Sequence, residues 1–145
     1  MSLSVILLVL ILVLALLSIF VALWKREGSG SIVVKECYWL VNSTRVVEAR
    51  HGDVVTAVVV LSTPTNFNGF IEVRVKRDLK LLPDEAVAIL KQYYIIGYGE
   101  EVIVKLRFKT EYSIIARGYF IEVKWRNGKY SMVASYPPRL RILKD

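Results

Sequence analysis

Residues 3–24 read LSVILLVLILVLALLSIFVALW, and this stretch decides how the rest of the chain is organised. It contains no charged residue, no Gly and no Pro, and its only polar residues are Ser4 and Ser18. At about 1.5 Å per residue, a helix of this length spans roughly 33 Å, close to the ~30 Å hydrocarbon core of a bilayer. Lipid offers no partner to exposed backbone groups, so the segment must be helical. The stretch therefore predicts one N-terminal transmembrane-type α-helix.

The flanks of the helix divide the chain into three parts. We predict a hydrophobic helix with a basic flank at 1–26, a Gly/Ser tether at 27–31 and one folded domain at 32–145. An aromatic residue at the membrane interface and a basic pair that snorkels into headgroups are typical of an anchor. The predicted anchor residues are Leu3, Leu10, Leu17, Trp24, Lys25 and Arg26.

Three interpretations of the helix remain open. A permanent single-pass anchor is favoured, because no Lys or Arg precedes residue 25 and the apolar run exceeds that of a secretory signal peptide. A cleaved signal peptide is the second, since residues 28–30 (GSG) could serve as a cleavage site. The third is a filament core, in which Ser18 and Ala22 provide a small-x-x-x-small helix contact. A helix followed by one β-domain resembles archaeal type IV pilins, which implies self-association.

The composition of the domain constrains its stability and its source. Cys37 is the only cysteine, so no intrachain disulfide forms, and its apolar strand-like surroundings predict a buried, inert thiol. Gln and His each occur once, whereas charged residues are abundant. This pattern is typical of hyperthermophile proteins and indicates a thermophilic archaeon.

Strand patterns follow the tether with little interruption. Residues 54–61 (VVTAVVVL) are apolar on both faces and predict a central, fully buried strand. Residues 70–77 and 101–109 alternate between apolar and charged side chains, and 117–126 place Tyr119, Ile121, Val123 and Trp125 on one face. Residues 83–94 are compatible with a helix or a strand, and we favour a strand or an irregular crossing segment over a helix. The patterns predict an all-β, antiparallel immunoglobulin-like β-sandwich of about seven or eight strands behind the helix.

Three short motifs support a family resemblance over residues 46–142. They are Gly52-Asp53 before an apolar strand, Gly99-Glu100-Glu101 before an alternating strand, and Gly118-Tyr119-x-Ile121-x-Val123. The span resembles the immunoglobulin-like sandwiches of cell-surface proteins, particularly the CARDB-like and fibronectin-III-like group. This resemblance implies a non-enzymatic module for adhesion, spacing or subunit contact.

Residues with catalytic or ligand-binding chemistry are scarce. His51 is the only histidine, and His51-Gly52-Asp53 is explained as a turn. One His and one Cys cannot form a usual zinc site, and the glycines form no phosphate-binding motif. We therefore predict no enzyme, cofactor, metal, nucleic acid or small-molecule substrate. The expected partners are membrane lipid and another protein or a second copy.

The net charge of +7 lies entirely in the last third of the chain. Residues 1–101 hold ten basic and ten acidic residues, whereas 102–145 hold ten and three. If the strands at 101–109 and 117–126 share a sheet, five cations project from one surface: Lys105, Arg107, Lys109, Lys124 and Arg126. Such a face predicts an anionic partner, either lipid headgroups or an acidic subunit.

The orientation across the membrane rests on opposing signals. The positive-inside rule places Lys25 and Arg26 in the cytoplasm, but long domains translocate largely regardless of charge. Asn42-Ser43-Thr44 is an N-glycosylation sequon, which is usable only outside the cytoplasm. Together with the fold class, this favours an extracytoplasmic domain. We expect a membrane-anchored structural or binding module in a cell-surface or membrane complex, with an archaeal pilus-like filament subunit as the alternative.

Overall fold

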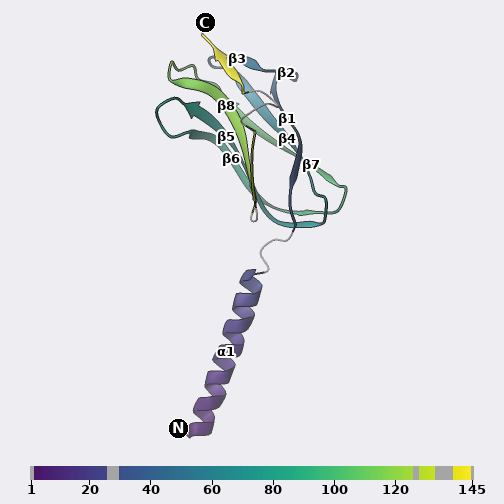
Figure 1. The fold of residues 1–145 in the computed structure, drawn as a ribbon, viewed down its shortest axis with the longest axis vertical. Coiled ribbons are helices and arrows are strands. Elements are labelled where there is room, and N and C mark those ends of the chain that lie inside the picture. Colours follow the sequence, from purple (N-terminus) through teal and green to yellow (C-terminus); the bar gives the residue numbers. More distant parts are fainter. Residues whose placement is uncertain (1, 26–29, 126–127, 133–138, 145) are drawn as a thin grey trace.

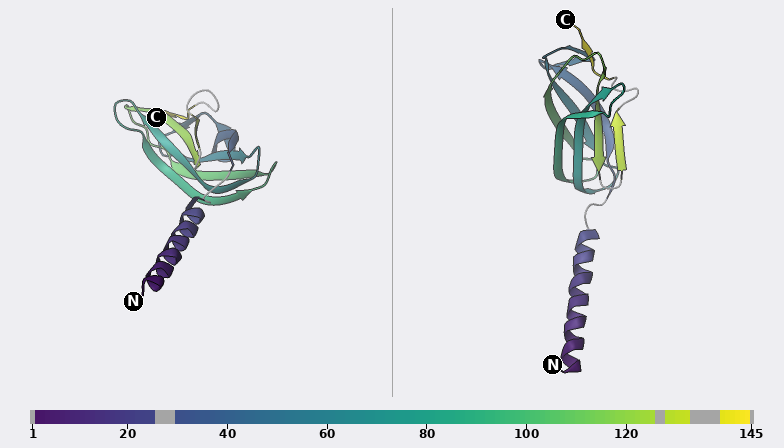
Figure 2. Two further views of the ribbon diagram at one scale, coloured as in Figure 1. Left: turned by 60° about the horizontal axis from the view of Figure 1, so that its bottom comes forward. Right: turned by 90° about the vertical axis from the view of Figure 1, so that its left-hand side faces the viewer.

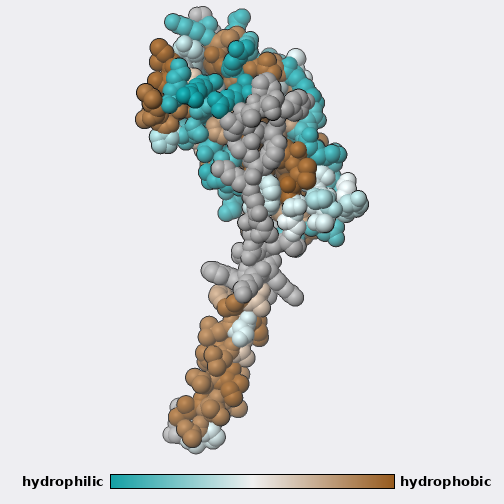
Figure 3. All heavy atoms as spheres, viewed as in Figure 1, coloured by the Kyte–Doolittle hydropathy of each residue, from teal (hydrophilic) through white to brown (hydrophobic). Residues whose placement is uncertain are grey.

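The computed structural model describes residues 2–25, 30–125, 128–132 and 139–144, without the side chains of 23–25 and 128–132. A single helix, α1 (Leu3–Lys25), stands apart from a β-sandwich (Figure 1). The side chains of residues 3–22 are all exposed, so this part of α1 packs against no described part of the sandwich. Leu3–Ala22 is long and apolar enough to cross a bilayer, and a signal sequence has the same character. In Figure 3 the helix forms a hydrophobic column, whereas hydrophilic residues cover much of the sandwich.

The sandwich consists of two antiparallel four-stranded sheets and one small parallel pair, seen from two further directions in Figure 2. The first sheet has the order β2-β1-β4-β7, and the second has the order β6-β5-β8-β9. The first comprises β1 (Val33–Val41), β2 (Thr44–Val46), β4 (Val54–Ser62) and β7 (Glu101–Lys109). The second comprises β5 (Phe67–Leu79), β6 (Glu85–Ile96), β8 (Ala116–Trp125) and β9 (Gly128–Met132). The pair joins β3 (Glu48–Arg50) to β10 (Arg141–Leu143). This arrangement confirms the predicted immunoglobulin-like sandwich.

The core lies between the two sheets, where the inward side chains of their strands meet. β4 is a central strand, and Val55, Ala57, Val59 and Leu61 project from it into the core. Val58 and Val60 are also buried, although they lie on its other face. The prediction of a strand buried on both faces is thus confirmed for residues 57–61, whereas Val54 is exposed and Thr56 is half-buried. An aromatic column crosses the core, in which the ring centroids of Trp39 and Phe108 are 5.9 Å apart and those of Phe108 and Tyr119 are 5.0 Å apart.

The alternating segments adopt the predicted faces. Ile71, Val73 and Val75 of β5 are buried, as are Val104, Leu106 and Phe108 of β7 and Tyr119, Ile121 and Val123 of β8. The ambiguous segment is a strand, because residues 85–96 pair along β5 with a bulge beside Val75 and Lys76. The region 44–50 divides into β2 and β3, which raises the strand number above the predicted seven or eight.

One predicted juxtaposition is wrong. β7 and β8 belong to different sheets, so Lys124 does not share a face with Lys105, Arg107 and Lys109. The alternation within a strand fixes which residues face the core, but it does not specify which sheet the strand joins. Lys124 instead forms an ion pair with Glu122 at 3.2 Å on the second sheet, while Arg126 lies outside the described residues.

The domain's thiol is enclosed, as predicted. Cys37 projects from β1 into the core and is 1% exposed. Burial, assisted by the nearby charge of Glu36, raises the pKa of Cys37 to about 12.

We expect the folded chain to resist thiol alkylation at pH 8, because the thiolate is the reactive species. Against an unfolded pKa of about 8.5, the thiolate fraction falls on the order of 10³-fold on folding. A raised folded-state pKa stabilises the fold below about pH 8.5, and this contribution disappears as the pH rises towards 12. Labelling with iodoacetamide in mild detergent, with and without denaturant, measures the protection. Rapid labelling of the native chain would contradict it.

Candidate interaction surfaces

The first candidate surface is the basic face, which we define as Lys105, Arg107 and Lys109 on the outer side of β7. All three side chains are exposed, and none forms an ion pair with another described residue. In the register of the sheet they lie opposite Val58, Thr56 and Val54 of β4. β7 begins at Glu101 and ends at Lys109, so the three charges extend from the middle of the strand to its Lys109 end. This surface can attract an anionic partner without disturbing the core.

An open groove brings the basic face together with the glycosylation sequon. It is lined by Lys105 and Arg107 and by residues of β1, β4 and the β1–β2 turn: Leu40, Asn42, Ser43, Val54 and Thr56. Asn42 and Ser43 form a two-residue turn with φ of 49° and 64°, and both are exposed. Positive φ at both central positions suits the right-handed twist of a two-residue hairpin. A modification at Asn42 would therefore share this groove with an anionic partner.

Other sequence-predicted site residues lie far from this groove in the chain. Leu3, Leu10, Leu17 and Ala22 are exposed on α1, and the side chains of Trp24 and Lys25, with Arg26, fall outside the described part. Ser18 donates its hydroxyl to the carbonyl of Leu14 at 2.9 Å, so this polar group is satisfied within the helix. This contact leaves Ser18 compatible with a lipid environment.

His51 has a structural role in the turn between β3 and β4. Its Nδ1 atom accepts a hydrogen bond from the Tyr112 backbone N–H at 3.0 Å. Asp53 accepts one from the Arg50 N–H at 2.8 Å, and the Gly52 N–H donates to the Thr110 carbonyl at 2.9 Å. Within the described ranges no three His, Cys, Asp or Glu side chains group around a metal-sized site. The histidine tethers the loop before β8 to the turn.

A second candidate surface, which sequence analysis missed, is the aliphatic tip formed by Leu81, Leu82, Ile114 and Ile115. These residues occupy the β5–β6 and β7–β8 loops, where Figure 3 shows a hydrophobic group over the loops seen at upper left in Figure 1. Leu81 is 92% exposed and Ile114 is 79% exposed. The paired aliphatic residues, Leu81-Leu82 and Ile114-Ile115, stand in segments without strand alternation, and this was the available signal. An exposed apolar cluster in a water-facing loop is typical of a contact site.

The two loops of the aliphatic tip are joined by hydrogen bonds. The Lys80 N–H donates to the Ile115 carbonyl at 2.8 Å, and the Lys80 ammonium donates to the Ile114 carbonyl at 3.2 Å. Within the second loop, the Ala116 N–H donates to the Ser113 carbonyl at 3.1 Å. These bonds fix the loops before any partner arrives, which lowers the entropic cost of binding.

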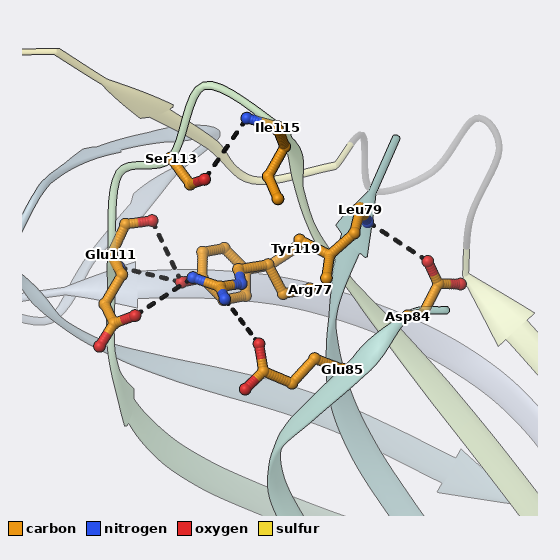
Figure 4. Close-up of polar contacts among 8 residues, drawn as sticks. All are labelled: Arg77, Leu79, Asp84, Glu85, Glu111, Ser113, Ile115 and Tyr119. Atoms are coloured by element: carbon orange, nitrogen blue, oxygen red, sulfur yellow. Dashed lines mark hydrogen bonds and ion pairs between the residues drawn. The ribbon is translucent and has the colours of Figure 1, made fainter. Parts of the chain in front are cut away.

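A cluster centred on Arg77 holds together the strands and the loop next to the aliphatic tip (Figure 4). The Arg77 guanidinium pairs with Glu85 at 2.6 Å and with Glu111 at 3.1 Å, so it connects β5, β6 and the β7–β8 loop. Burial alone lowers the pKa of Arg77, but the hydrogen bond and charge of Glu85 raise it overall. The guanidinium therefore stays charged and holds both carboxylates.

Tyr119 anchors the same loop through a tyrosine corner, a feature of immunoglobulin-like sandwiches. Its phenolic oxygen accepts a hydrogen bond from the Glu111 backbone N–H at 2.9 Å (Figure 4). The backbone of Tyr119 also exchanges two hydrogen bonds with Leu140. Gly118 permits this approach, because its φ is +128° and a Cβ atom there would lie 2.4 Å from the Leu140 carbonyl oxygen.

Comparison with known proteins gives the fold of the sandwich. No family model matches the chain, and no curated protein matches it. Among solved structures, a cycloisomaltooligosaccharide glucanotransferase of Paenibacillus sp., complexed with cycloisomaltoheptaose, is similar with a TM-score of 0.50 and 16% identity. The similarity covers 82% of this chain but only 15% of that enzyme. At this identity the match shows a shared β-rich fold alone.

Replacing Tyr119 by Phe tests the support of the aliphatic tip. The change keeps the buried ring but leaves the Glu111 N–H without its partner, so we expect a loss of about 1–2 kcal/mol in the free energy of unfolding. Tyr112→Phe, on an exposed ring of the same loop, should change it by less than about 0.5 kcal/mol. Denaturant unfolding of the full chain in micelles, followed by tryptophan fluorescence, measures both. Equal stability of Tyr119→Phe and wild type would refute the corner's role.

Proposed function

We propose that this chain is a non-enzymatic, membrane-anchored binding module, a tethered extracytoplasmic β-sandwich within a cell-surface or membrane complex. The observation that carries the proposal is the aliphatic tip, which is exposed yet held in place by the Lys80 bonds and the Arg77 cluster. Because these apolar side chains are exposed, they contribute little to the stability of the sandwich. Their presentation favours contact with another apolar surface. The CARDB-like and fibronectin-III-like resemblance supports the same function.

The aliphatic tip lies at the end of the sandwich opposite to the point where the tether joins it. The Thr63 hydroxyl donates to the Ser31 carbonyl at 2.9 Å, which places the chain's entry at the β4–β5 loop. From Glu101, near that end, to Lys109, β7 extends about 27 Å at 3.4 Å per residue. The loop with Ile114 and Ile115 follows β7 directly. A module with its free end equipped for contact suits a tethered receptor or spacer.

The proposed partner is an acidic protein subunit with an apolar contact area. Lys80 and Arg117 are exposed beside the aliphatic tip, and the basic face approaches the same end of the sandwich through Lys109. Because the basic face extends towards the end of the sandwich away from the tether, an acidic subunit suits it better than the headgroup layer around α1. Cationic side chains around an apolar centre steer such a partner and set its register.

Co-purification from native membranes tests this proposal. With the tagged full chain in mild detergent, we expect a partner protein in fixed ratio. Leu81→Ser combined with Ile114→Ser should reduce its recovery at least tenfold, because the apolar centre is lost. Lys105→Gln, Arg107→Gln and Lys109→Gln together should weaken recovery at low salt and flatten its salt dependence, because screening acts on exposed charges.

The matched control is Val33→Ser combined with Ile103→Ser, which removes two exposed aliphatic residues of the first sheet outside the aliphatic tip. This variant should retain the partner. A chain that always purifies alone as a monomer, or an aliphatic-tip variant that keeps its partner, would overturn the proposal. A filament subunit, favoured by the helix-plus-sandwich layout, would instead appear as long polymers of this chain alone, with the α1 surfaces around Ser18 and Ala22 in contact.

The extracytoplasmic orientation has its own test. We expect a C-terminal tag to be digested when protease is added to intact cells, because the sandwich would be outside the membrane. A cytoplasmic marker protein in the same cells should remain intact. Digestion of the tag only after permeabilisation would place the sandwich in the cytoplasm.

A further inference from the structure

Four large side chains form an exposed patch at the end of the sandwich where the chain enters. We define this tether-end patch as Phe70, Tyr93, Ile95 and Tyr98, of which Ile95 is 78% and Tyr98 is 76% exposed. Phe70 and Tyr93 are cross-strand neighbours of β5 and β6, and their rings meet edge to face with centroids 5.2 Å apart. The Lys91 ammonium lies 5.4 Å from the centre of the Phe70 ring.

Two contacts connect this patch to the start of the sandwich. The Tyr98 N–H donates to the Asn66 side-chain carbonyl at 2.9 Å. Asn66 in turn lies against Gly30, where φ is +91° and a Cβ atom would lie 2.4 Å from the Asn66 backbone oxygen. The close approach requires glycine and holds the entering chain beside the β6–β7 turn. Asn66 therefore connects Tyr98 to Gly30, where the chain enters the domain.

The length of the connection limits how far this end can lie from α1. The helix ends at Lys25, and Gly30 is five residues later. Five residue steps span at most about 18 Å, even when fully extended. If α1 is a membrane anchor, the tether-end patch always stays close to the headgroup layer. A short linker raises the effective concentration of such a surface into the millimolar range, so weak affinity suffices.

We propose that the tether-end patch inserts into the interfacial layer of the bilayer that holds α1. The inference rests on the proposed anchor function and adds a second membrane contact to it. Tyrosine and phenylalanine suit this layer, because their rings can enter the acyl boundary and the phenolic hydroxyl of tyrosine stays hydrated. The aliphatic stem of Lys91 is long enough for its ammonium group to reach lipid phosphates while the patch is in the interface. The contact turns the outer face of the second sheet to the lipid and leaves the basic face turned away.

A pair of isoleucines allows a matched test on the full chain in phosphatidylcholine liposomes. Ile95→Cys and Ile114→Cys replace side chains that are 78% and 79% exposed, one in the tether-end patch and one in the aliphatic tip. Each variant is labelled with an environment-sensitive fluorophore, and wild type checks that buried Cys37 stays unlabelled. Tyr98→Cys provides a second position in the patch. Lipid-attached and aqueous quenchers then report where each label lies.

We expect the labels at 95 and 98 to emit at shorter wavelength and to be quenched by nitroxide lipids several-fold more than the label at 114. Iodide in the aqueous phase should show the opposite order. Equal water exposure of all three labels would overturn the inference, as would shielding that rises with the protein-to-lipid ratio, since a second copy would then cover the patch. A chain that fails to float with liposomes after an alkaline wash would instead refute the anchor itself.

Discussion

Tyr119 connects the two sheets, the β7–β8 loop and the C-terminal segment through non-covalent contacts. Its ring packs against Phe108 of the opposite sheet, and its hydroxyl fixes the Glu111 backbone. Its own backbone pairs with Leu140 and thereby brings the C-terminal segment onto β8. A domain with one cysteine depends on packing and hydrogen bonding at such points. Tyr119 thus packs in the core and also holds the β7–β8 loop, which carries Ile114 and Ile115 of the aliphatic tip.

The sequence allowed the fold to be predicted wherever a strand is buried on a consistent face. Alternation at 70–77 and 101–109 and the apolar run at 54–61 each determine which side chains meet the core. The pattern could not assign a strand to a sheet, because that choice depends on long-range pairing; Lys124 was therefore placed with the wrong neighbours. Residues 83–94 remained ambiguous because an edge strand buries little, and its pattern resembles a short amphipathic helix.

The candidate surfaces were only partly predictable. The basic face follows directly from the alternation in β7, since Lys105, Arg107 and Lys109 must point away from Val104, Leu106 and Phe108. The aliphatic tip and the tether-end patch combine residues from separate segments, and only the tertiary structure shows that they meet. Phe70 gave a local hint, because it falls on the face of β5 that carries Glu72 and Arg74. The periodicity of a segment predicts which of its residues face the core, but it does not predict which segments together form a surface for a partner.

If α1 anchors the chain in a membrane, the position of the basic face on an edge strand has a consequence for neighbouring copies. An edge strand offers free backbone donors and acceptors to a neighbouring chain, and confinement to two dimensions increases the frequency of encounters. In the first sheet, one edge is the three-residue β2 and the other is β7 with its row of cations. Two β7 strands that approached side by side would bring like charges together, and a three-residue strand offers little ladder to extend. The same side chains that we propose for contact with an acidic subunit would therefore discourage sheet-to-sheet fusion between neighbouring copies.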